Sequence, residues 1–340
     1  MKTLFRRLRG PLAGPAKAAT LTLGLLAVGL LFSSPASASS SSCAHPVTSA
    51  ATGPATVSAA PTSDYGRVLV VGSGAYAGCS LYMLTSDQLH TLSGADFACS
   101  DNLNVLGPTN PCDTVLWPAL LTNGAPIAGP GVNPTLLGTV TRTDLLTGMS
   151  VQQVTYAGLP LYRFFLDEMP GETEGADLFD PVTSPTGIWY LVDPSRGLPA
   201  PGRAQLQLET APINGSGANE TVLAATMNDD FHVFPNASFP AYSLSTDSGH
   251  QSACQELCSA EYWPPVLTSR RPTAGPGVDQ RALGTMVRAD GTHQVTYHGK
   301  PMYLFYQDAY IGTLAIGTQG INGAGLGTPW GVFNTFRPLP

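Results

Sequence analysis

The sequence predicts a mainly β fold, made of two tandem antiparallel β-meander repeat domains with short turns, local disulfides and little helix. Composition is the first indication: the chain has 37 glycines and 30 prolines but only 11% charged residues, which favours short strands and tight turns. The second is a phrase that occurs twice, as QVTYAGLPLYRFFLD at 153–167 and as QVTYHGKPMYLFYQD at 294–308. The third is six cysteines, an even number that allows complete pairing.

Residues 1–38 have the pattern of a secretory signal peptide. The basic stretch MKTLFRRLRG precedes an apolar run at 21–32, which is too short to span a bilayer, and an Ala-x-Ala cleavage site ends at Ala38. Arg6 and Arg7 are typical of twin-arginine export, but the rest of that signal is missing, so the general export route is favoured. The mature protein is therefore expected to be secreted or extracytoplasmic, with no transmembrane segment.

Charge restricts the possible partners. The predicted signal peptide contains five basic residues and no acidic one, so its removal lowers the formal net charge from −7 to −12. A chain this acidic is expected to be repelled by nucleic acid and by anionic membrane surfaces.

The segment 39–63 is rich in Ser, Ala and Pro and is expected to be a flexible spacer. It contains Cys43, which raises the question of a lipid anchor. A lipobox requires an aliphatic residue three places before the cysteine, and Ser40 occupies that place. A lipid anchor at Cys43 is therefore not expected, although acylation of Cys43 would leave Cys79 as a free thiol.

The two halves of the remaining chain align on their tryptophans. CDTVLWPALLT around Trp117 matches CSAEYWPPVLT around Trp263, and AGPGV occurs at both 128–132 and 274–278. Arg142 likewise aligns with Arg288. The predicted domains are a first β repeat domain at 64–196, a linker at 197–221 and a second β repeat domain at 222–340.

The repeated phrase has the pattern of a strand, a turn and a second strand. Side chains alternate along a strand, so Tyr162 and Phe164 are expected to share one face, as are Tyr303 and Phe305. Asp167 and Asp308 fall where the last strand should end. Each of these carboxylates could close an Asx turn or accept a hydrogen bond from a tyrosine hydroxyl.

Two fainter copies of the phrase keep its Tyr and Asp. They are Tyr82 with Asp87, and Tyr242 with Asp247, so the spacing occurs four times. A repeat this short rarely buries a core alone, so the copies are expected to pack against one another. These residues are candidates for structure or for binding, according to whether they are buried in separate cores or converge on a cleft.

These motifs give the chain a specific resemblance. It resembles the secreted-repeat family of predicted bacterial lipoproteins with a Tyr-x-aromatic-x-x-Asp motif, through LYMLTSD, WPALL, LGTVTRTD and QVTYAGLPLYRFFLD, and again through AYSLSTD, WPPVL, LGTMVRADG and QVTYHGKPMYLFYQD. The resemblance implies export, often a lipid anchor, tandem repeats and no established activity. The chain departs from it in lacking a good lipobox and in having Leu84 and Leu244 at two aromatic positions.

Position within the repeat predicts the disulfides. Cys99 and Cys112 lie between the first motif and the first Trp-Pro, and Cys254 and Cys258 lie in the corresponding interval of the second half. The predicted pairs are Cys99–Cys112, Cys254–Cys258 and, from the two cysteines that remain, Cys43–Cys79.

Catalytic and cofactor signatures are missing or incomplete. The glycines of VLVVGSGAYAG at 68–78 fit a dinucleotide fingerprint, but a strand-like segment follows them where a helix is required. His250, Cys254 and Cys258 resemble a metal site, but an oxidising compartment favours the disulfide. No nucleophile motif occurs, so no catalytic residue, metal or cofactor is assigned.

Trp117 and Trp263 are either core residues or part of an aromatic platform for a ligand such as a glycan. The function predicted is a non-enzymatic cell-envelope or extracellular module, either binding or structural, whose partner is an envelope protein or a surface polymer. The alternative is a metal- or redox-associated extracytoplasmic protein.

Overall fold

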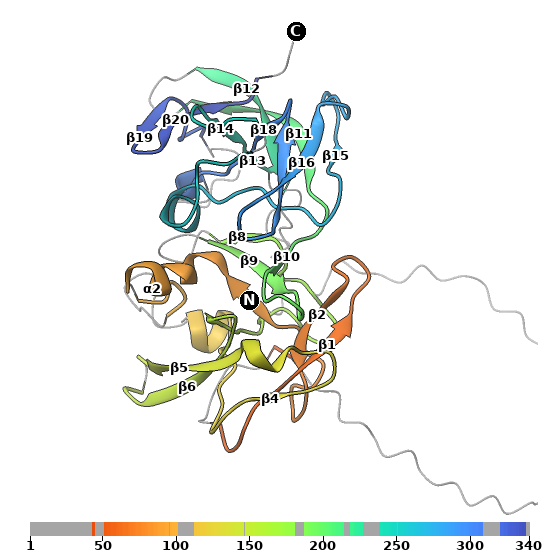
Figure 1. Ribbon diagram of the computed structural model, residues 1–340, viewed down its shortest axis with the longest axis vertical. Coiled ribbons are helices and arrows are strands. Elements are labelled where there is room, and N and C mark those ends of the chain that lie inside the picture. The colour runs from red at the N-terminus through yellow and green to blue at the C-terminus, as the bar shows by residue number, and fades with distance from the viewer. Residues whose placement is uncertain are drawn as a thin grey trace, which may run out of the picture. The chain divides into compact units, whose positions relative to one another are not determined.

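The computed structural model describes residues 43–44, 51–94, 96–100, 112–145, 147–180, 187–213, 218–226, 238–249, 251–308 and 320–337. The described residues belong to one compact unit, and their fold is mainly β, as the composition and motifs predicted (Figure 1). The predicted signal peptide lies outside the described residues.

Among the helices of the described segments, none has both the length and the apolar character needed to cross a membrane.

The described residues of the first half form three small sheets. The sheets have the orders β2-β1-β4, β10-β9-β3 with β8 also on β9, and β5-β6-β7. Their strands are β1 (Thr56–Pro61), β2 (Arg67–Val71), β3 (Tyr82–Leu84), β4 (Ile127–Ala128), β5 (Leu137–Thr143), β6 (Ser150–Tyr156), β7 (Leu159–Pro160), β8 (Leu178–Asp180), β9 (Gly187–Val192) and β10 (Pro199–Ala200). The helical segments are short: η1 (Thr85–Asp87), α2 (Gln88–Ser93), η2 (Cys112–Leu116) and η3 (Pro134–Leu136).

Three sheets are also formed by the part of the second half that the structure describes. They have the orders β13-β12-β11-β15, β14-β20-β19 and β16-β17-β18. Their strands are β11 (Gln205–Pro212), β12 (Asn219–Thr226), β13 (Ser238–Pro240), β14 (Tyr242–Leu244), β15 (Thr273–Ala274), β16 (Leu283–Val287), β17 (His293–Tyr297), β18 (Lys300–Pro301), β19 (Leu326–Thr328) and β20 (Gly331–Thr335). Single helical turns lie at η4 (Cys258–Tyr262) and η5 (Tyr306–Asp308).

Strand pairings match between the halves. In each half a long strand pairs antiparallel with the next strand and parallel with a two-residue strand: β1 with β2 and β4, and β11 with β12 and β15. The three-stranded meanders β5-β6-β7 and β16-β17-β18 also correspond, and both are antiparallel throughout. These meanders are the elements that the repeated phrase predicted.

The turn inside each phrase has the same backbone conformation. Ala157 and Gly158 join β6 to β7 with φ of 50° and 86°, and His298 and Gly299 join β17 to β18 with φ of 49° and 77°. Positive φ at both central residues is typical of the type I′ turn, whose twist suits a two-residue hairpin. Glycine at the second position therefore meets a conformational requirement that both copies share.

Among the described residues, three apolar clusters form the core. One contains residues of both halves, including Leu161 and Met302, and across it Phe179 of the first half meets Phe239 of the second edge to face at 5.0 Å. The other two are richer in aromatic rings and belong to one half each; Trp117 lies in the first and Trp263 in the second. Each half thus packs on one side around its own aromatic cluster and on the other around a common cluster.

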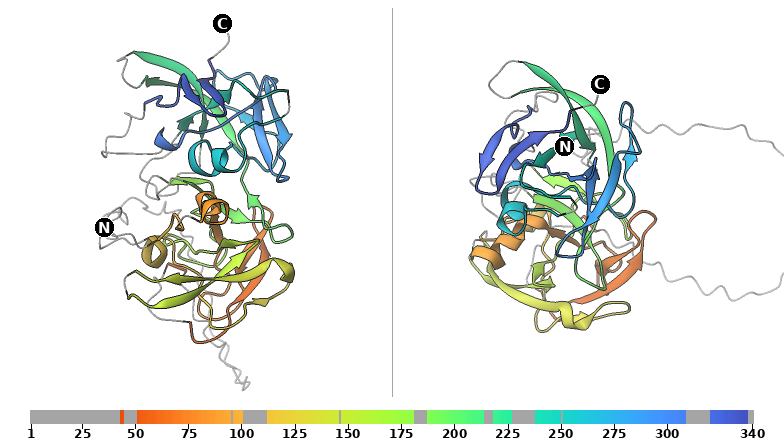
Figure 2. Two further views of the ribbon diagram at one scale, coloured as in Figure 1. Left: turned by 60° about the vertical axis from the view of Figure 1, so that its left-hand side comes forward. Right: turned by 45° about the horizontal axis from the view of Figure 1, so that its top comes forward.

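The segments predicted to be a spacer at 39–63 and a linker at 197–221 both contain strands. β11 and the start of β12 lie within 197–221, and Figure 2 shows this pair in green. β1 lies within 39–63, where Cys43 is also fully buried. Leu206 and Leu208 alternate with polar residues in β11, but the Pro- and Gly-rich flanks hid this period-two signal.

Candidate functional site

The tyrosine and aspartate of the repeated motif form crossed pairs in the first half. The Tyr82 hydroxyl donates to Oδ2 of Asp167 at 2.8 Å, and the Tyr162 hydroxyl donates to Oδ2 of Asp87 at 2.8 Å. Each tyrosine therefore bonds the aspartate of the other motif copy, 85 or 75 residues away in the sequence. All four residues are at most 1% exposed.

The second half repeats this crossing. The Tyr242 hydroxyl donates to Oδ2 of Asp308 at 2.6 Å, and the Tyr303 hydroxyl lies 2.9 Å from Oδ2 of Asp247. Both tyrosines and Asp308 are buried, whereas Asp247 is partly exposed. Each tyrosine–aspartate hydrogen bond thus joins two copies of the motif, and each half contains two copies joined in this way.

Backbone hydrogen bonds hold the copies in this crossed register. Tyr82 and Tyr162 exchange both of their N–H···O bonds, at 2.9 and 3.0 Å, and Tyr242 and Tyr303 do the same at 2.8 and 2.9 Å. Such reciprocal bonding is the hydrogen-bonded pair of an antiparallel ladder. It places the two tyrosine side chains of a half on the same face, each beside the other copy's carboxylate.

Strand alternation sorts the motif side chains between clusters. Tyr303 and Phe305 lie in the aromatic cluster of the second half, while Met302 and Leu304 between them lie in the common cluster. Tyr162 and Phe164 share the aromatic cluster of the first half. The shared-face expectation is met by these positions. Leu84 and Leu244, which replace motif aromatics, also join the aromatic clusters of their halves.

The second oxygen of each motif carboxylate accepts from a later backbone N–H. Oδ1 of Asp87 accepts from Ala98, that of Asp167 from Glu174, that of Asp247 from Ala253 and that of Asp308 from Asn322, at 2.8 to 3.1 Å. The carboxylates therefore anchor the loops that follow the motif. Of the two roles expected for these aspartates, the structure supports acceptance from a tyrosine; the backbone donors lie too far along the chain for a local Asx turn.

Burial dominates the electrostatics of these groups. Loss of hydration raises the pKa of Asp308 to about 7 and that of Asp87 to about 6, and it also raises the pKa values of Asp167 and Asp247. Hydrogen bonds from the tyrosines act in the opposite direction and are outweighed. The same burial raises the pKa values of the four motif tyrosines, which therefore stay protonated as donors.

The tryptophans pack in the aromatic clusters in the same way in both halves. Trp117 stacks on Trp189 with ring centroids 3.7 Å apart, and Trp263 stacks on Phe333 at 3.6 Å. A motif tyrosine meets each tryptophan edge to face, Tyr82 at 5.5 Å and Tyr242 at 5.4 Å. Both tryptophans are at most 1% exposed, so neither forms a surface platform for a glycan.

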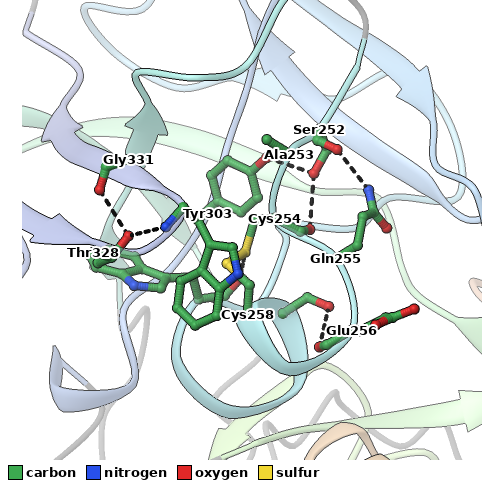
Figure 3. Close-up of a disulfide and its surroundings, with 12 residues drawn as sticks. Ser252, Ala253, Cys254, Gln255, Glu256, Cys258, Tyr303, Thr328 and Gly331 are labelled. Carbon is green, nitrogen blue, oxygen red and sulfur yellow. Dashed lines mark hydrogen bonds between the residues drawn. A yellow bond between two sulfur atoms is a disulfide. The ribbon is translucent and has the colours of Figure 1, made fainter.

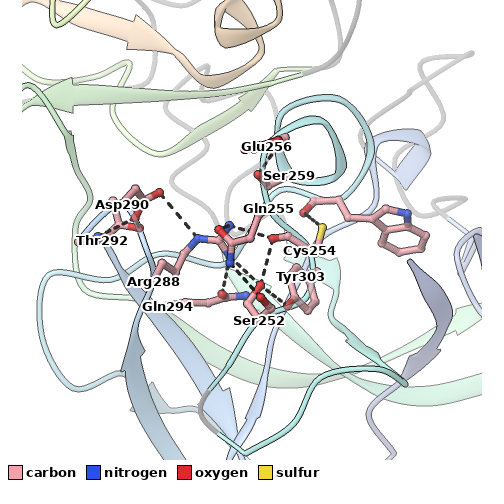
Figure 4. A network of polar contacts seen from close by, with 12 residues as sticks. Ser252, Cys254, Gln255, Glu256, Ser259, Arg288, Asp290, Thr292, Gln294 and Tyr303 are labelled. Carbon is pink, nitrogen blue, oxygen red and sulfur yellow. Dashed lines mark hydrogen bonds and ion pairs between the residues drawn. The ribbon is translucent and has the colours of Figure 1, made fainter. Parts of the chain in front are cut away.

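A buried arginine links the meander to the disulfide loop in each half. Arg142 donates to the Cys99 carbonyl at 2.6 Å and to Oε1 of Gln153 at 2.8 Å. Arg288 donates to the Cys254 carbonyl at 2.9 Å and to Oε1 of Gln294 at 2.7 Å (Figure 4). A buried cation needs such partners, because unpaired burial is costly.

Sequence reasoning missed this role of the arginines. Their alignment and the glutamine that begins both QVTY copies were the only signals, and neither shows that a charged side chain will be buried. The arginine contacts differ between the halves. Arg142 reaches the Tyr162 hydroxyl at 3.2 Å and pairs with Asp113 at 2.7 Å. Ser252 lies between Arg288 and Tyr303, and the acidic group nearest to Arg288 is Asp290 at 3.8 Å.

The structure contains three disulfides, and they are the three pairs expected from the sequence. They are Cys43–Cys79, Cys99–Cys112 and Cys254–Cys258. Figure 3 shows the Cys254–Cys258 disulfide beside Tyr303.

Arg163 adds a further restraint at the Cys43–Cys79 disulfide. Its guanidinium donates to the Cys43 carbonyl at 2.7 Å and lies over the Tyr76 ring.

The chemistry available to the described residues is limited. All six cysteines are oxidised, and in the described segments no group of three His, Cys, Asp or Glu side chains is placed to hold a metal ion. His250 of the metal candidate lies outside those segments. The glycines at 72–78 return the chain from β2, with Val71 and Cys79 bonded to each other across the turn, and no helix begins there.

A concavity in the described residues lies apart from the motif. It has a volume of about 490 Å³ and is lined by residues from six separate stretches of the chain. Its lining includes Tyr65, Arg67, Asp193, Arg196 and His293, and it contains no residue of the four motifs. No sequence signal indicated this pocket, because its parts come together only in the folded chain.

Comparison with known proteins gives one family match. Residues 284–333 match the model of a family described as a secreted repeat of unknown function. The matched segment begins in β16 and ends in β20, so it includes Tyr303, Phe305, Asp308 and the stacking partner Phe333. No curated protein and no solved structure gives a match.

Proposed function

We propose that this chain is an exported, non-enzymatic module of the cell envelope or extracellular space that acts by binding or by providing structure. One observation supports it above all: the residues that the sequence repeats are used inside the fold. Tyr82, Tyr162 and Tyr242 donate to buried aspartates, and Tyr303 donates to the partly exposed Asp247. All four aspartates anchor loops. Tyrosine and aspartate side chains that are bonded to each other inside the fold have a structural role, and no motif residue lines the pocket.

The proposal includes a tandem organisation. Each half would be one repeat domain built from two motif copies, with boundaries shifted from the sequence expectation so that β1 belongs to the first half and β11 to the second. The matching strand pairings and crossed side-chain pairs support this division. The common apolar cluster would then join the two domains.

Cell location follows from the N-terminal pattern and from the oxidised cysteines. Signal-peptide cleavage would release a mature chain into an oxidising compartment, where three disulfides persist. Cys43 is buried and paired with Cys79, so we propose that it is not acylated. The partner would be an envelope protein or a surface polymer, and an acidic chain would not associate with nucleic acid.

A sedimentation assay tests this proposal. Purified mature protein is mixed with washed envelope fractions, and the bound fraction is compared with that of the same protein after reduction and alkylation. The proposal predicts saturable retention of the folded protein that is lost after reduction. Absence of retention on every fraction, or turnover of a substrate by the folded protein, would contradict it.

A further inference from the structure

The pocket of about 490 Å³ has the size of a small-molecule or oligosaccharide site. One wall is formed by Tyr65 and Arg67, a second by 193–196, and a third by residues of the second half, among them Ser269 and His293. Five of the lining residues carry a hydroxyl, and the hydroxyls of Ser195, Thr268 and Thr292 donate to Asp193, to the Arg270 carbonyl and to Asp290. Side chains of this kind match a ligand that carries many hydroxyl groups.

Hydrogen bonds hold the walls of the pocket in place. The Ser269 N–H donates to the Gly202 carbonyl at 2.9 Å, and the Ala204 N–H donates to Oγ1 of Thr268 at 3.1 Å. Arg196 also reaches the Gly291 carbonyl at 3.4 Å. The pocket is therefore preformed, which lowers the ordering cost of binding.

Positive charge gathers at this pocket on a chain with a formal net charge of −7. Of the eight exposed arginine and lysine residues in the described segments, Arg67 and Arg196 line the pocket, and Arg270 directly follows the lining residue Ser269. Asp193 is the acidic residue of the lining, and it is bonded to Arg196 and to Ser195.

Arg67 has the greatest donor capacity in the lining. Within the described part of the chain, its guanidinium donates one hydrogen bond, to the Ala59 carbonyl at 3.1 Å, and forms no ion pair. A guanidinium carries five N–H donors in a planar fork that suits a carboxylate. Most of its donors are thus available to an anionic group in the pocket.

We propose that this pocket binds an acidic carbohydrate, with Arg67 receiving a carboxylate of the sugar and the hydroxyl-bearing walls contacting the ring. The proposal rests on the proposed function, because it specifies the surface polymer as the partner. Because Arg196 is paired with Asp193, Arg67 is the lining arginine without an ion pair among the described residues. One such arginine on an acidic chain favours a short anionic segment over a long polyanion, which the rest of the chain repels.

Calorimetric titration with tetragalacturonate at physiological salt tests the proposal, with neutral galacto-oligosaccharide of the same length and inorganic phosphate as comparison ligands. The variant is Arg67→Gln, and Arg281→Gln is the matched control, because Arg281 is an exposed arginine outside the pocket that pairs with Asp279. Wild type and Arg281→Gln should bind tetragalacturonate equally. Arg67→Gln should bind it about tenfold more weakly, as expected for loss of a charge-assisted hydrogen bond.

Four results would overturn the proposal. They are no saturable binding of tetragalacturonate to wild type, equal binding by Arg67→Gln, an equal loss in Arg281→Gln, and phosphate binding as tight as that of the oligosaccharide. The envelope assay separates this failure from that of the proposed function. Retention of wild type on envelope fractions without tetragalacturonate binding refutes the pocket assignment alone, whereas absence of retention refutes the broader function.

Discussion

Replacing Tyr242 with phenylalanine removes one hydroxyl from the centre of the second half. That hydroxyl donates to Oδ2 of Asp308 at 2.6 Å and accepts from the Gly323 N–H at 3.2 Å. Tyr242 is fully buried, so water cannot replace either bond without entering the aromatic cluster. The substitution keeps the ring and its edge-to-face contact with Trp263, which isolates the loss of the hydroxyl.

The size of the effect follows from these two bonds. A hydrogen bond to a charged group contributes roughly 1.5–3 kcal/mol, and an orphaned buried N–H adds a cost of its own. We therefore expect Tyr242→Phe to lower the free energy of unfolding by about 2–4 kcal/mol at a pH well above the raised pKa of Asp308. Tyr306→Phe, which removes an exposed hydroxyl bonded to Gln307, should cost less than about 0.5 kcal/mol.

Urea unfolding followed by tryptophan fluorescence measures both values. A double-mutant cycle with Asp308→Asn isolates the interaction, and the cost of Tyr242→Phe should fall by about 1–2 kcal/mol when the carboxylate is absent. Equal costs in both backgrounds, or a cost of Tyr242→Phe no larger than that of Tyr306→Phe, would refute the argument that this pair stabilises the half.

Three further predictions concern the same framework. The pKa of Asp308 is about 7 in the folded protein, against an ordinary 3.8, so the folded state binds the proton more tightly than the unfolded state does. The free energy of unfolding should therefore fall as pH rises between these two values, by up to ~4 kcal/mol. Urea titrations across this range should show a smaller fall for the Asp308→Asn variant. Gly323→Ala should destabilise by about 1–3 kcal/mol, because a Cβ there would lie 2.7 Å from Trp263, whereas Gly327→Ala has open space and should be neutral. Loss of the Cys43–Cys79 bridge should cost about 4 kcal/mol, measured as the shift in urea midpoint of the double Ser variant.

Each of these predictions has a result that contradicts it. A flat or rising pH profile would mean that Asp308 is charged at no cost in the folded state. Equal stability of the two glycine variants would mean that Trp263 can shift to accommodate the added methyl group at little cost. An unchanged midpoint in the Ser variant would mean that the N-terminal segment is not held by its bridge.

Local patterns in the sequence were sufficient for part of the fold. The QVTY phrase and its Gly turn predicted the meander, because alternation and turn chemistry act over a few residues. Two of the disulfides followed from position within the repeat, and Cys43–Cys79 followed from the two cysteines that remained. The strand β11 was not predicted from the sequence, because its two leucines lie between Pro- and Gly-rich stretches.

The candidate site was less accessible to sequence reasoning. The bond between Asp308 and a tyrosine was one of two roles open to that residue, but the choice of Tyr242 as the partner depends on the backbone pairing of two distant copies. The burial of Arg288 also could not be seen, because its partners are backbone and side-chain groups of other segments. The pocket at Arg67 requires six stretches of chain to be placed in space.

Nitration of the folded protein with tetranitromethane, mapped by peptide mass spectrometry, tests most directly whether the motif is internal scaffold. Tyr82, Tyr162, Tyr242 and Tyr303 are buried, while Tyr306 is partly exposed. We predict that Tyr306 is nitrated in the native protein and that the four motif tyrosines react only after denaturation. Rapid nitration of the motif tyrosines in the native state would contradict the account, because it would place them at an open surface.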